Sequence, residues 1–289
     1  MTTMPALDLL NAIPADEFIA ALDGVFEHAP WVAAAAAADR PFATVTALHD
    51  SLMKAVRGAP PELCDNFLRG HPALSPKALA DPALTASSRS EQNGLGMTSL
   101  GDDLARFERE SASYEARFGF PFITCVRRQT PPFVLRALQR RLSNDIEAER
   151  AAALAEIGHI TRLRLVDRIT GPGMPKTTGH LSSHVLDTVR GKAAAGVKIE
   201  LFREGVLIKE GVTNHDGRTD EPLLHDEPLR VGRYELRFHV ADYFADTGFG
   251  ADPVWYDVIP IRFSVGEPEG RYHIPLLLGV WSYTTYRGS

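Results

Sequence analysis

Histidine and arginine side chains in the C-terminal part of the chain could carry out hydrolytic chemistry. His184 and His273 lie in apolar, strand-like segments, and Arg218 follows a tight turn at residues 214–217. A neutral imidazole, with a pKa of about 6.5, can take a proton from water near neutral pH. A guanidinium can hold a planar imide-like oxygen and stabilise the negative charge that develops on it. These three residue types suit hydrolytic opening of an amide-like bond.

The N-terminal part of the chain has the pattern of a helical bundle. From Ala6 to Leu165 the apolar residues recur at helical spacing. The pattern is clearest from Phe133 to Leu165, which predicts one long helix. Pro14 precedes the first periodic stretch and Pro131 the last, as is typical of helix starts. We therefore expect an all-α N-terminal domain.

The period changes from 3.6 to 2 after a segment rich in Gly, Pro and Thr at residues 170–179, which predicts a linker. Regularly spaced short strands follow it and predict a β-sandwich. The expected strands are 184–189, 197–202, 232–240, 258–265 and 272–278, with one short helix at 241–246. The expected organisation is an all-α domain at 1–167, a linker at 168–179 and a β-sandwich at 180–289.

Composition narrows the function classes. The chain has 289 residues, 44% of them hydrophobic, and a net charge of -6, so it predicts packed cores and does not favour nucleic-acid or anionic-membrane binding. Cys64 and Cys125 are too few for a disulfide framework, which indicates a reducing cytoplasm. We find no basic leader, no long apolar run, no metal-ligand spacing and no nucleotide-binding fingerprint, so we expect no membrane span and no cofactor.

The β part resembles the 5-hydroxyisourate hydrolases, the transthyretin-related enzymes of urate breakdown, over residues 180–289. The resemblance rests on residues 183–187 (SHVLD), 213–218 (TNHDGR), 272–278 (YHIPLLL) and 286–289 (YRGS). It implies catalysis by His184, Arg218, His273 and Ser289, with Tyr286 and Arg287 binding substrate. It also implies a dimer of dimers with active sites at the subunit junctions. Gly279-Val280-Trp281 departs from the usual Ser-Pro, which would alter the wall of that site.

The helical part resembles 2-oxo-4-hydroxy-4-carboxy-5-ureidoimidazoline (OHCU) decarboxylase over residues 5–166. The matching segments are 70–74 (GHPAL), 88–94 (SRSEQNG), 114–122 (YEARFGFPF), 141–145 (RLSND) and 162–165 (RLRL). The resemblance implies that His71 and Glu91 carry protons without a metal or organic cofactor. It places Pro72, Ser88, Gln92, Phe120, Ile123 and Arg164 around the substrate.

Together, the two resemblances imply a bifunctional enzyme that hydrolyses 5-hydroxyisourate to OHCU and decarboxylates OHCU to (S)-allantoin. The implied partners are these two small molecules and further copies of the chain, forming a tetramer through the β domain with dimer contacts through the helical domain. One alternative is a transthyretin-like small-molecule binding protein. Another is a hydrolase whose helical domain is an inactive scaffold.

Local structure offers simpler explanations for several of these residues. A histidine on a strand is more often a surface residue, and Arg218 after a tight turn is more often solvated. Ser88-x-x-Glu91 has the spacing of a capping box, in which both side chains only complete a first helical turn. Arg162 and Arg164 lie two apart on a predicted helix, so only one of them can face a given pocket; we expect Arg164.

Overall fold

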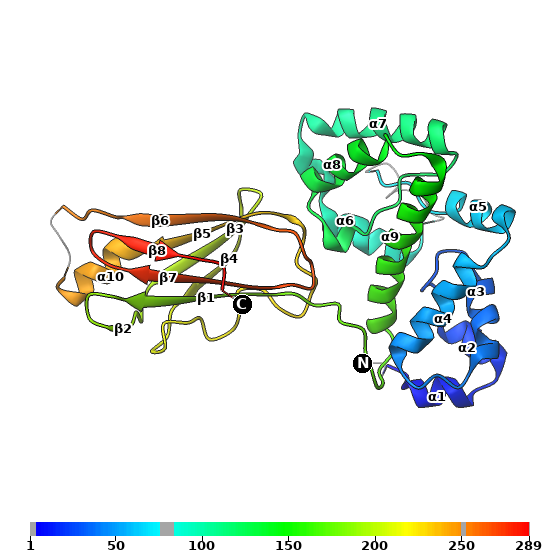
Figure 1. The fold of residues 1–289 in the computed structure, drawn as a ribbon, viewed down its shortest axis with the longest axis horizontal. Coiled ribbons are helices and arrows are strands. Elements are labelled where there is room, and N and C mark those ends of the chain that lie inside the picture. The colour runs from blue at the N-terminus through cyan, green and yellow to red at the C-terminus, as the bar shows by residue number, and fades with distance from the viewer. Residues whose placement is uncertain (1–3, 76–83, 250–252, 289) are drawn as a thin grey trace. The chain divides into compact units, whose positions relative to one another are not determined.

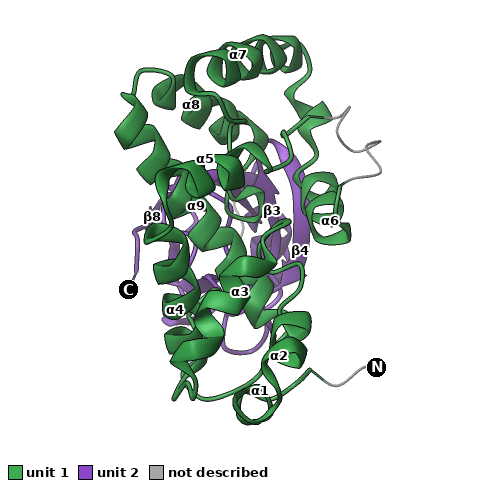
Figure 2. Ribbon diagram, turned by 90° about the vertical axis from the view of Figure 1, so that its right-hand side faces the viewer, with its two compact units in different colours: residues 1–177 green, residues 178–289 purple. Residues whose placement is uncertain are grey.

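The chain forms two compact units, residues 1–177 and residues 178–289, which Figure 2 shows in different colours. The structure is a computed structural model, and it describes residues 4–75, 84–249 and 253–288. Residues 1–177 are called the helical unit below, and residues 178–289 the β unit.

The secondary structure of the helical unit is helical, as the apolar period predicts. α2 begins directly after Pro14, and α8 begins at Pro131, because proline's fixed φ suits a first turn whose N–H groups have no intrahelical acceptor. The helices are α1 (Leu7–Ala12), α2 (Ala15–Ala21), α3 (Pro30–Ala36), α4 (Val45–Arg57), α5 (Pro61–Arg69), α6 (Ala86–Leu95), α7 (Asp103–Phe118), α8 (Pro131–Arg141) and α9 (Ile146–Val166).

The prediction of one long helix from Phe133 to Leu165 is wrong. α8 ends at Arg141, and a new helix, α9, begins at Ile146. The side chain of Asp145 accepts a hydrogen bond from the N–H of Ala148 at 2.8 Å, so Asp145 caps a second helix. The apolar period continues through the break because both helices bury a face in the same core.

Helix α9 is the central element of the helical unit (Figure 1). Near its start, Glu149 contacts α7 and α8 through Tyr114 and Arg141. Near its end, Thr161 contacts His49 of α4 at 3.0 Å. Apolar side chains from all these helices form one buried cluster. A residue on α9 can therefore be held rigidly against several other helices.

The segment predicted as a linker packs partly on the helical unit. The carbonyls of Thr170 and Pro172 accept hydrogen bonds from the N–H groups of Leu7 and Val45 at 2.8 and 2.9 Å. A Cβ on Gly171 would lie 2.8 Å from the Leu7 side chain, which only glycine avoids. This part of the segment is therefore built into the helical unit rather than acting as a free spacer.

The β unit consists of two four-stranded sheets with the strand orders β2-β1-β7-β8 and β4-β3-β5-β6. β1 and β7 pair in parallel, and the other neighbours pair antiparallel. Alternate side chains from both sheets form one buried cluster, as in a sandwich. The elements are β1 (His180–Asp187), β2 (Lys192–Ala193), β3 (Lys198–Arg203), β4 (Val206–Val212), β5 (Gly232–His239), α10 (Val240–Thr247), β6 (Val258–Val265), β7 (Arg271–Leu278) and β8 (Tyr283–Thr285).

The predicted strands and the short helix of the β unit are confirmed, with shifts at their ends. β1 starts at His180, four residues before the prediction, and ends at Asp187. The sequence pattern missed β2, β4 and β8. β4 has no strict alternation, because most of its side chains are exposed or half-buried on both faces.

Candidate active sites

A pocket in the helical unit lies between the segment after α5, helix α6, residues 122–126 and α9. The empty volume between its lining residues, counted together with the open mouth, is about 390 Å³. Its described lining consists of His71, Pro72, Leu74, Ser88, Glu91, Gln92, Phe122, Ile123, Thr124, Val126, Ile160 and Arg164. The structure therefore brings together the residues predicted for this site, with one exception. Phe120 is absent from this lining, since its ring is buried against Tyr114 with the ring centres 6.0 Å apart.

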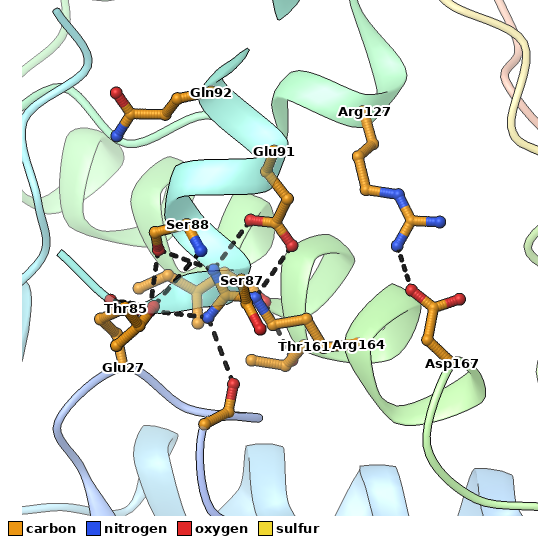
Figure 3. Close-up of polar contacts among 12 residues, drawn as sticks. Glu27, Thr85, Ser87, Ser88, Glu91, Gln92, Arg127, Thr161, Arg164 and Asp167 are labelled. Atoms are coloured by element: carbon orange, nitrogen blue, oxygen red, sulfur yellow. Dashed lines mark hydrogen bonds and ion pairs between the residues drawn. The ribbon is translucent and has the colours of Figure 1, made fainter. Parts of the chain in front are cut away.

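Arg164 is the centre of the polar contacts in this pocket (Figure 3). Its Nε and Nη2 donate to the two carboxylate oxygens of Glu91 at 3.0 and 2.8 Å, a bidentate pair. Its Nη2 also donates to the Oγ of Ser88 at 2.9 Å. Arg164 is almost fully buried, so these contacts fix the positions of two further residues predicted for the site.

Glu27, which the sequence analysis did not select, is part of the same network. Its Oε2 accepts from the Nη1 of Arg164 at 2.8 Å and from the Oγ of Ser88 at 2.9 Å. Burial raises the pKa of Glu27, but hydrogen bonds from Thr85 and the nearby charge of Arg164 outweigh it, so the pKa of Glu27 is lowered overall. The only sequence signal was a charged residue directly after the apolar pair Val25-Phe26.

The capping-box explanation for Ser88 and Glu91 is wrong. The N-cap of α6 is Thr85, whose side chain accepts a hydrogen bond from the N–H of Ser88. Ser88 and Glu91 therefore lie inside the helix, three residues apart on one face. Their side chains are free to take part in the pocket rather than complete the first turn.

His71 lines the pocket as a neutral imidazole. Burial lowers its pKa to about 4; the charge of Glu27 opposes this shift, and that of Arg164 adds to it. Among the described residues, its Nδ1 is buried and has no hydrogen-bond partner. Its ring packs edge-on against Phe67 with the ring centres 5.5 Å apart. The imidazole lines the pocket, so near neutral pH it can exchange a proton with a molecule bound there.

A buried ion pair supports the wall of the pocket that residues 122–126 form. Arg141 and Glu149 form this pair, and the Nη1 of Arg141 donates to the carbonyl of Ile123 at 2.7 Å. The guanidinium also lies over the ring of Phe122, 4.7 Å from its centre. Arg141, the first residue of the motif at 141–145, thus fixes the backbone of Ile123, which lines the pocket.

Acid is expected to destabilise the helical unit as the pH falls below about 6.5. Burial lowers the pKa values of His49, His71 and His159 to about 4 each, so between about pH 4 and pH 6.5 the folded state binds fewer protons than the unfolded chain. The stability is therefore complete above the unfolded pKa and is lost as the pH falls toward 4. Urea unfolding followed by helical circular dichroism should show a lower midpoint near pH 5 than near pH 7.5. The same midpoint at both pH values in the wild type would contradict this, and the variant His49→Gln/His159→Gln should show a smaller difference.

The predicted residues of the β unit meet on the outward face of the sheet containing β1 and β7, which lie side by side in Figure 1. In the parallel register Ser182 is opposite His273, and His184 is opposite Pro275. Since Leu181, Ser183 and Val185 are buried, the side chains of Ser182 and His184 point outward, as does that of His273. The Oγ of Ser182 lies 3.0 Å from the Nδ1 of His273.

Arg218 reaches this face because its turn is attached to β1. Gly217 has a φ of +70°, and a Cβ there would lie 2.3 Å from the carbonyl oxygen of Val185, so only glycine fits. The Gly217 carbonyl in turn accepts from the N–H of Val185 at 2.8 Å. As a result, the Nη2 of Arg218 lies 3.3 Å from the Nδ1 of His184.

Both histidines on this face have pKa values below their ordinary value. Burial lowers the pKa of His184, and the charge of Arg218 adds to the effect. Burial also lowers the pKa of His273, followed by the charges of Arg218 and His184. A pair of neutral imidazoles beside a permanent cation can accept a proton from water and stabilise an oxyanion.

The C-terminal segment is held beside His273. The N–H of Gly288 donates to the carbonyl of His273 at 2.8 Å, and a Cβ on Gly288 would lie 2.8 Å from the imidazole. The guanidinium of Arg287 lies over the ring of Tyr272, 4.7 Å from its centre, while Tyr286 is exposed. Ser289 lies outside the described residues.

Neither unit offers an obvious metal centre. Across residues 4–75, 84–249 and 253–288, the structure contains no group of three or more His, Cys, Asp or Glu side chains that could hold a metal ion. No helix in those residues is long and apolar enough to span a membrane.

Comparison with protein families assigns both units. Residues 11–166 match the OHCU decarboxylase family, and residues 181–288 match the HIUase/Transthyretin family. A 5-hydroxyisourate hydrolase of Deinococcus radiodurans is 52% identical over 118 residues, covering 39% of this chain and 99% of that protein. An OHCU decarboxylase of Amia calva is 38% identical over 164 residues, covering 56% of this chain and 94% of that protein.

One solved structure resembles the whole chain. The crystal structure of (S)-allantoin synthase aligns with a TM-score of 0.54 and 32% identity, covering 99% of this chain and 100% of that one. Both resemblances expected from the sequence motifs are therefore confirmed, as are the helical and transthyretin-type folds. The chain belongs to the OHCU decarboxylase family through its helical unit and to the HIUase/Transthyretin family through its β unit, in one fused protein of urate degradation.

Proposed function

We propose that this chain catalyses two consecutive reactions, hydrolysis of 5-hydroxyisourate to OHCU in the β unit and decarboxylation of OHCU to (S)-allantoin in the helical unit. The observation that carries the proposal is that one chain assembles both residue sets. His71, Ser88, Glu91 and Arg164 share a pocket, and His184, Arg218 and His273 share a sheet face.

In the hydrolytic step, a neutral imidazole of the β unit takes a proton from the attacking water. We assign this work to the pair His184 and His273, whose lowered pKa values keep them neutral near pH 7. Arg218 stabilises the negative charge that develops on the carbonyl oxygen as the ring opens. Tyr286 and Arg287 bind substrate from the C-terminal segment, which the Gly288 hydrogen bond holds beside His273. A catalytic role is assigned to Ser289, which lies outside the described residues.

In the decarboxylation, the carbon–carbon bond to the carboxylate breaks, CO₂ leaves, and the ring holds the electron pair. The substrate hydroxyl must lose a proton to become the carbonyl of allantoin, and a ring carbon must gain one on a single face. One further proton, taken up from water, neutralises the charge that the carboxylate leaves on the ring. His71 can carry out the first two transfers, because its neutral imidazole first accepts and then returns a proton. We assign Glu91 as the second proton carrier, while Arg164, Ser88, Gln92, Pro72 and Ile123 hold the substrate.

We also propose that the protein assembles as a homo-oligomer in the cytoplasm, as a tetramer through the β unit with dimer contacts through the helical unit. β8 and β6 are edge strands of their sheets, and edge strands can pair with another chain. Trp255 and Trp281 pack together and expose about two-thirds of their surface in the single chain, 65% and 66%.

The proposed location in the cytoplasm rests on the two cysteines. Cys64 and Cys125 are free thiols, which suits a reducing compartment.

The experiment that tests the function adds freshly prepared 5-hydroxyisourate and records absorbance and circular dichroism together. We expect accelerated loss of the substrate absorbance, followed by the optical signal of (S)-allantoin. Accelerated hydrolysis with racemic allantoin would make the helical unit a scaffold. Ligand binding without acceleration would make the β unit a carrier.

A further inference from the structure

Glu27 is a buried titratable group that the proposed mechanism does not use. It is 2% exposed, and it lies in the segment between α2 and α3, outside the described lining of the pocket. We propose that Glu27 is a positioning residue of the decarboxylase site, and that it makes Ser88 a hydrogen-bond acceptor for an N–H group of the substrate. This inference rests on the function proposed for the helical unit.

The hydrogen bonds of Glu27 converge on residues that line the pocket. One carboxylate oxygen accepts from both Arg164 and Ser88, and the other accepts from the Oγ1 of Thr85 at 2.7 Å. Thr85 is the N-cap of α6, the helix that carries Glu91. Glu27 thus connects Thr85, at the start of α6, to Arg164 of α9 (Figure 3).

The segment that carries Glu27 is fixed by its own contacts. His28 has a φ of +50°, in the left-handed region that a residue other than glycine adopts at a cost. Arg168 of the segment after α9 donates to the Asp23 carbonyl and, at 3.1 Å, to the Oγ of Ser87. The surrounding structure thus holds the backbone on both sides of Glu27 and directs its carboxylate at Arg164.

Proton counting sets the direction of each hydrogen bond of Ser88. An ionised carboxylate and a guanidinium have fixed roles as acceptor and donor. The single hydroxyl hydrogen of Ser88 is therefore donated to Glu27, and one lone pair accepts from Arg164. The remaining lone pair can accept a hydrogen bond but cannot donate one. OHCU carries ring and ureido N–H groups, so Ser88 can bind one of these and would repel a carbonyl oxygen.

Glu27 also balances the charge of Arg164. Arg164 is 4% exposed and has a carboxylate on each side, Glu27 at 2.8 Å and Glu91 at 2.8 Å. With Glu27 neutral, Arg164 would retain only Glu91, and the Ser88 hydroxyl hydrogen would be free to turn toward the substrate. The pocket would then present a donor where the substrate also presents a donor.

The test compares Glu27→Gln, Ser88→Ala and the double variant in the full-length chain. For Glu27→Gln we expect kcat/KM for OHCU to fall by about 100-fold through both a higher KM and a lower kcat, because a misplaced holding group affects ground and transition states. Ser88→Ala alone should lower kcat/KM about 10-fold. When Ser88→Ala is added to Glu27→Gln, it should lower kcat/KM by less than a further factor of about two, because the acceptor role of Ser88 is already lost.

Asp65→Asn is the matched control. Asp65 also binds an arginine of α9, Arg150 at 2.9 Å, and its ion pairs are with Arg150 and Arg69, which do not line the pocket. It should keep kcat and KM near the wild-type values. Hydrolysis by the β unit of the same molecules measures the amount of active β unit and so sets the protein concentration, and circular dichroism checks that Glu27→Gln retains its helices.

Three results would overturn the inference: wild-type kcat and KM in Glu27→Gln, a loss no larger than that of Asp65→Asn, or losses that multiply in the double variant. Each of these requires an active wild-type protein. If the wild type itself fails to accelerate formation of (S)-allantoin from OHCU, the proposed function fails instead, so the two failures are distinguishable.

Discussion

Replacing His71 with alanine is expected to lower kcat for decarboxylation by about 10³-fold and to leave hydrolysis of 5-hydroxyisourate unchanged. The reason is that the neutral imidazole of His71 lines the same pocket as Glu91 and Arg164. The measurement follows OHCU decay and the circular dichroism of allantoin. In the variant, allantoin should form at the uncatalysed rate and as a racemate.

His49→Gln is the matched control for that substitution. His49 is also a buried histidine whose pKa burial lowers to about 4, but it binds Thr161 and does not line the pocket. Its loss should reduce stability and leave kcat near the wild-type value. Equal losses of kcat in the two variants would mean that His71 acts only through folding.

The pH dependence of decarboxylation follows from the same residue. Because the pKa of His71 is lowered to about 4, the working neutral imidazole is fully populated from about pH 5.5 to 8 and is lost as the pH falls through 4. The rate should therefore be flat near neutrality, with a decline on the acid side only. Short assays after a pH jump separate this effect from acid unfolding. A decline centred near pH 6.5 would show that the imidazole is not buried as described.

Replacing His273 with alanine is expected to lower kcat/KM for hydrolysis of 5-hydroxyisourate by 10²-fold to about 10⁴-fold. His273 faces the same side of the sheet as His184, and Ser182 holds its ring through the Nδ1 contact at 3.0 Å. Substrate absorbance measures the loss. Decarboxylation of OHCU supplied to the variant should continue at the wild-type rate, since His273 belongs to the other unit.

His239→Ala controls for the loss of a half-buried strand histidine. His239 ends β5 in the other sheet, and its Nε2 lies 3.1 Å from a carboxylate oxygen of Glu200. We expect hydrolysis to continue unchanged in this variant. If His273→Ala retained the wild-type rate, His184 alone would have to serve as the base.

Much of the fold could be predicted because it is encoded locally. A backbone that repeats every 3.6 or 2 residues requires apolar side chains at that spacing, so the change of period after residue 170 separates the two units. The same reasoning missed the break between α8 and α9, because both helices bury a face in the same core and the apolar period continues across the break. The period runs through residues 142–145, although α8 ends at Arg141 and the capping contact between Asp145 and Ala148 starts α9.

The site was only partly predictable from motifs. The resemblance of the motifs to the decarboxylase family selected His71, Glu91 and Arg164, which the structure places in one pocket. It also selected Phe120 through the backbone of residues 118–123, and the structure buries the ring of Phe120 beside Tyr114. Glu27 was missed because a single glutamate after an apolar pair is normally solvated.

The sequence by itself determined the two periods, the helix starts and the order of the chemical motifs, all of which depend on neighbours a few residues apart. Tertiary structure alone decided which of these groups meet. Glu27 and Arg164 are 137 residues apart in the chain, and His273 reaches the face of His184 only through the parallel register of β1 and β7. The physical reason is that hydrogen-bond direction, burial and pKa depend on atoms within a few ångströms, and packing of distant segments supplies those atoms.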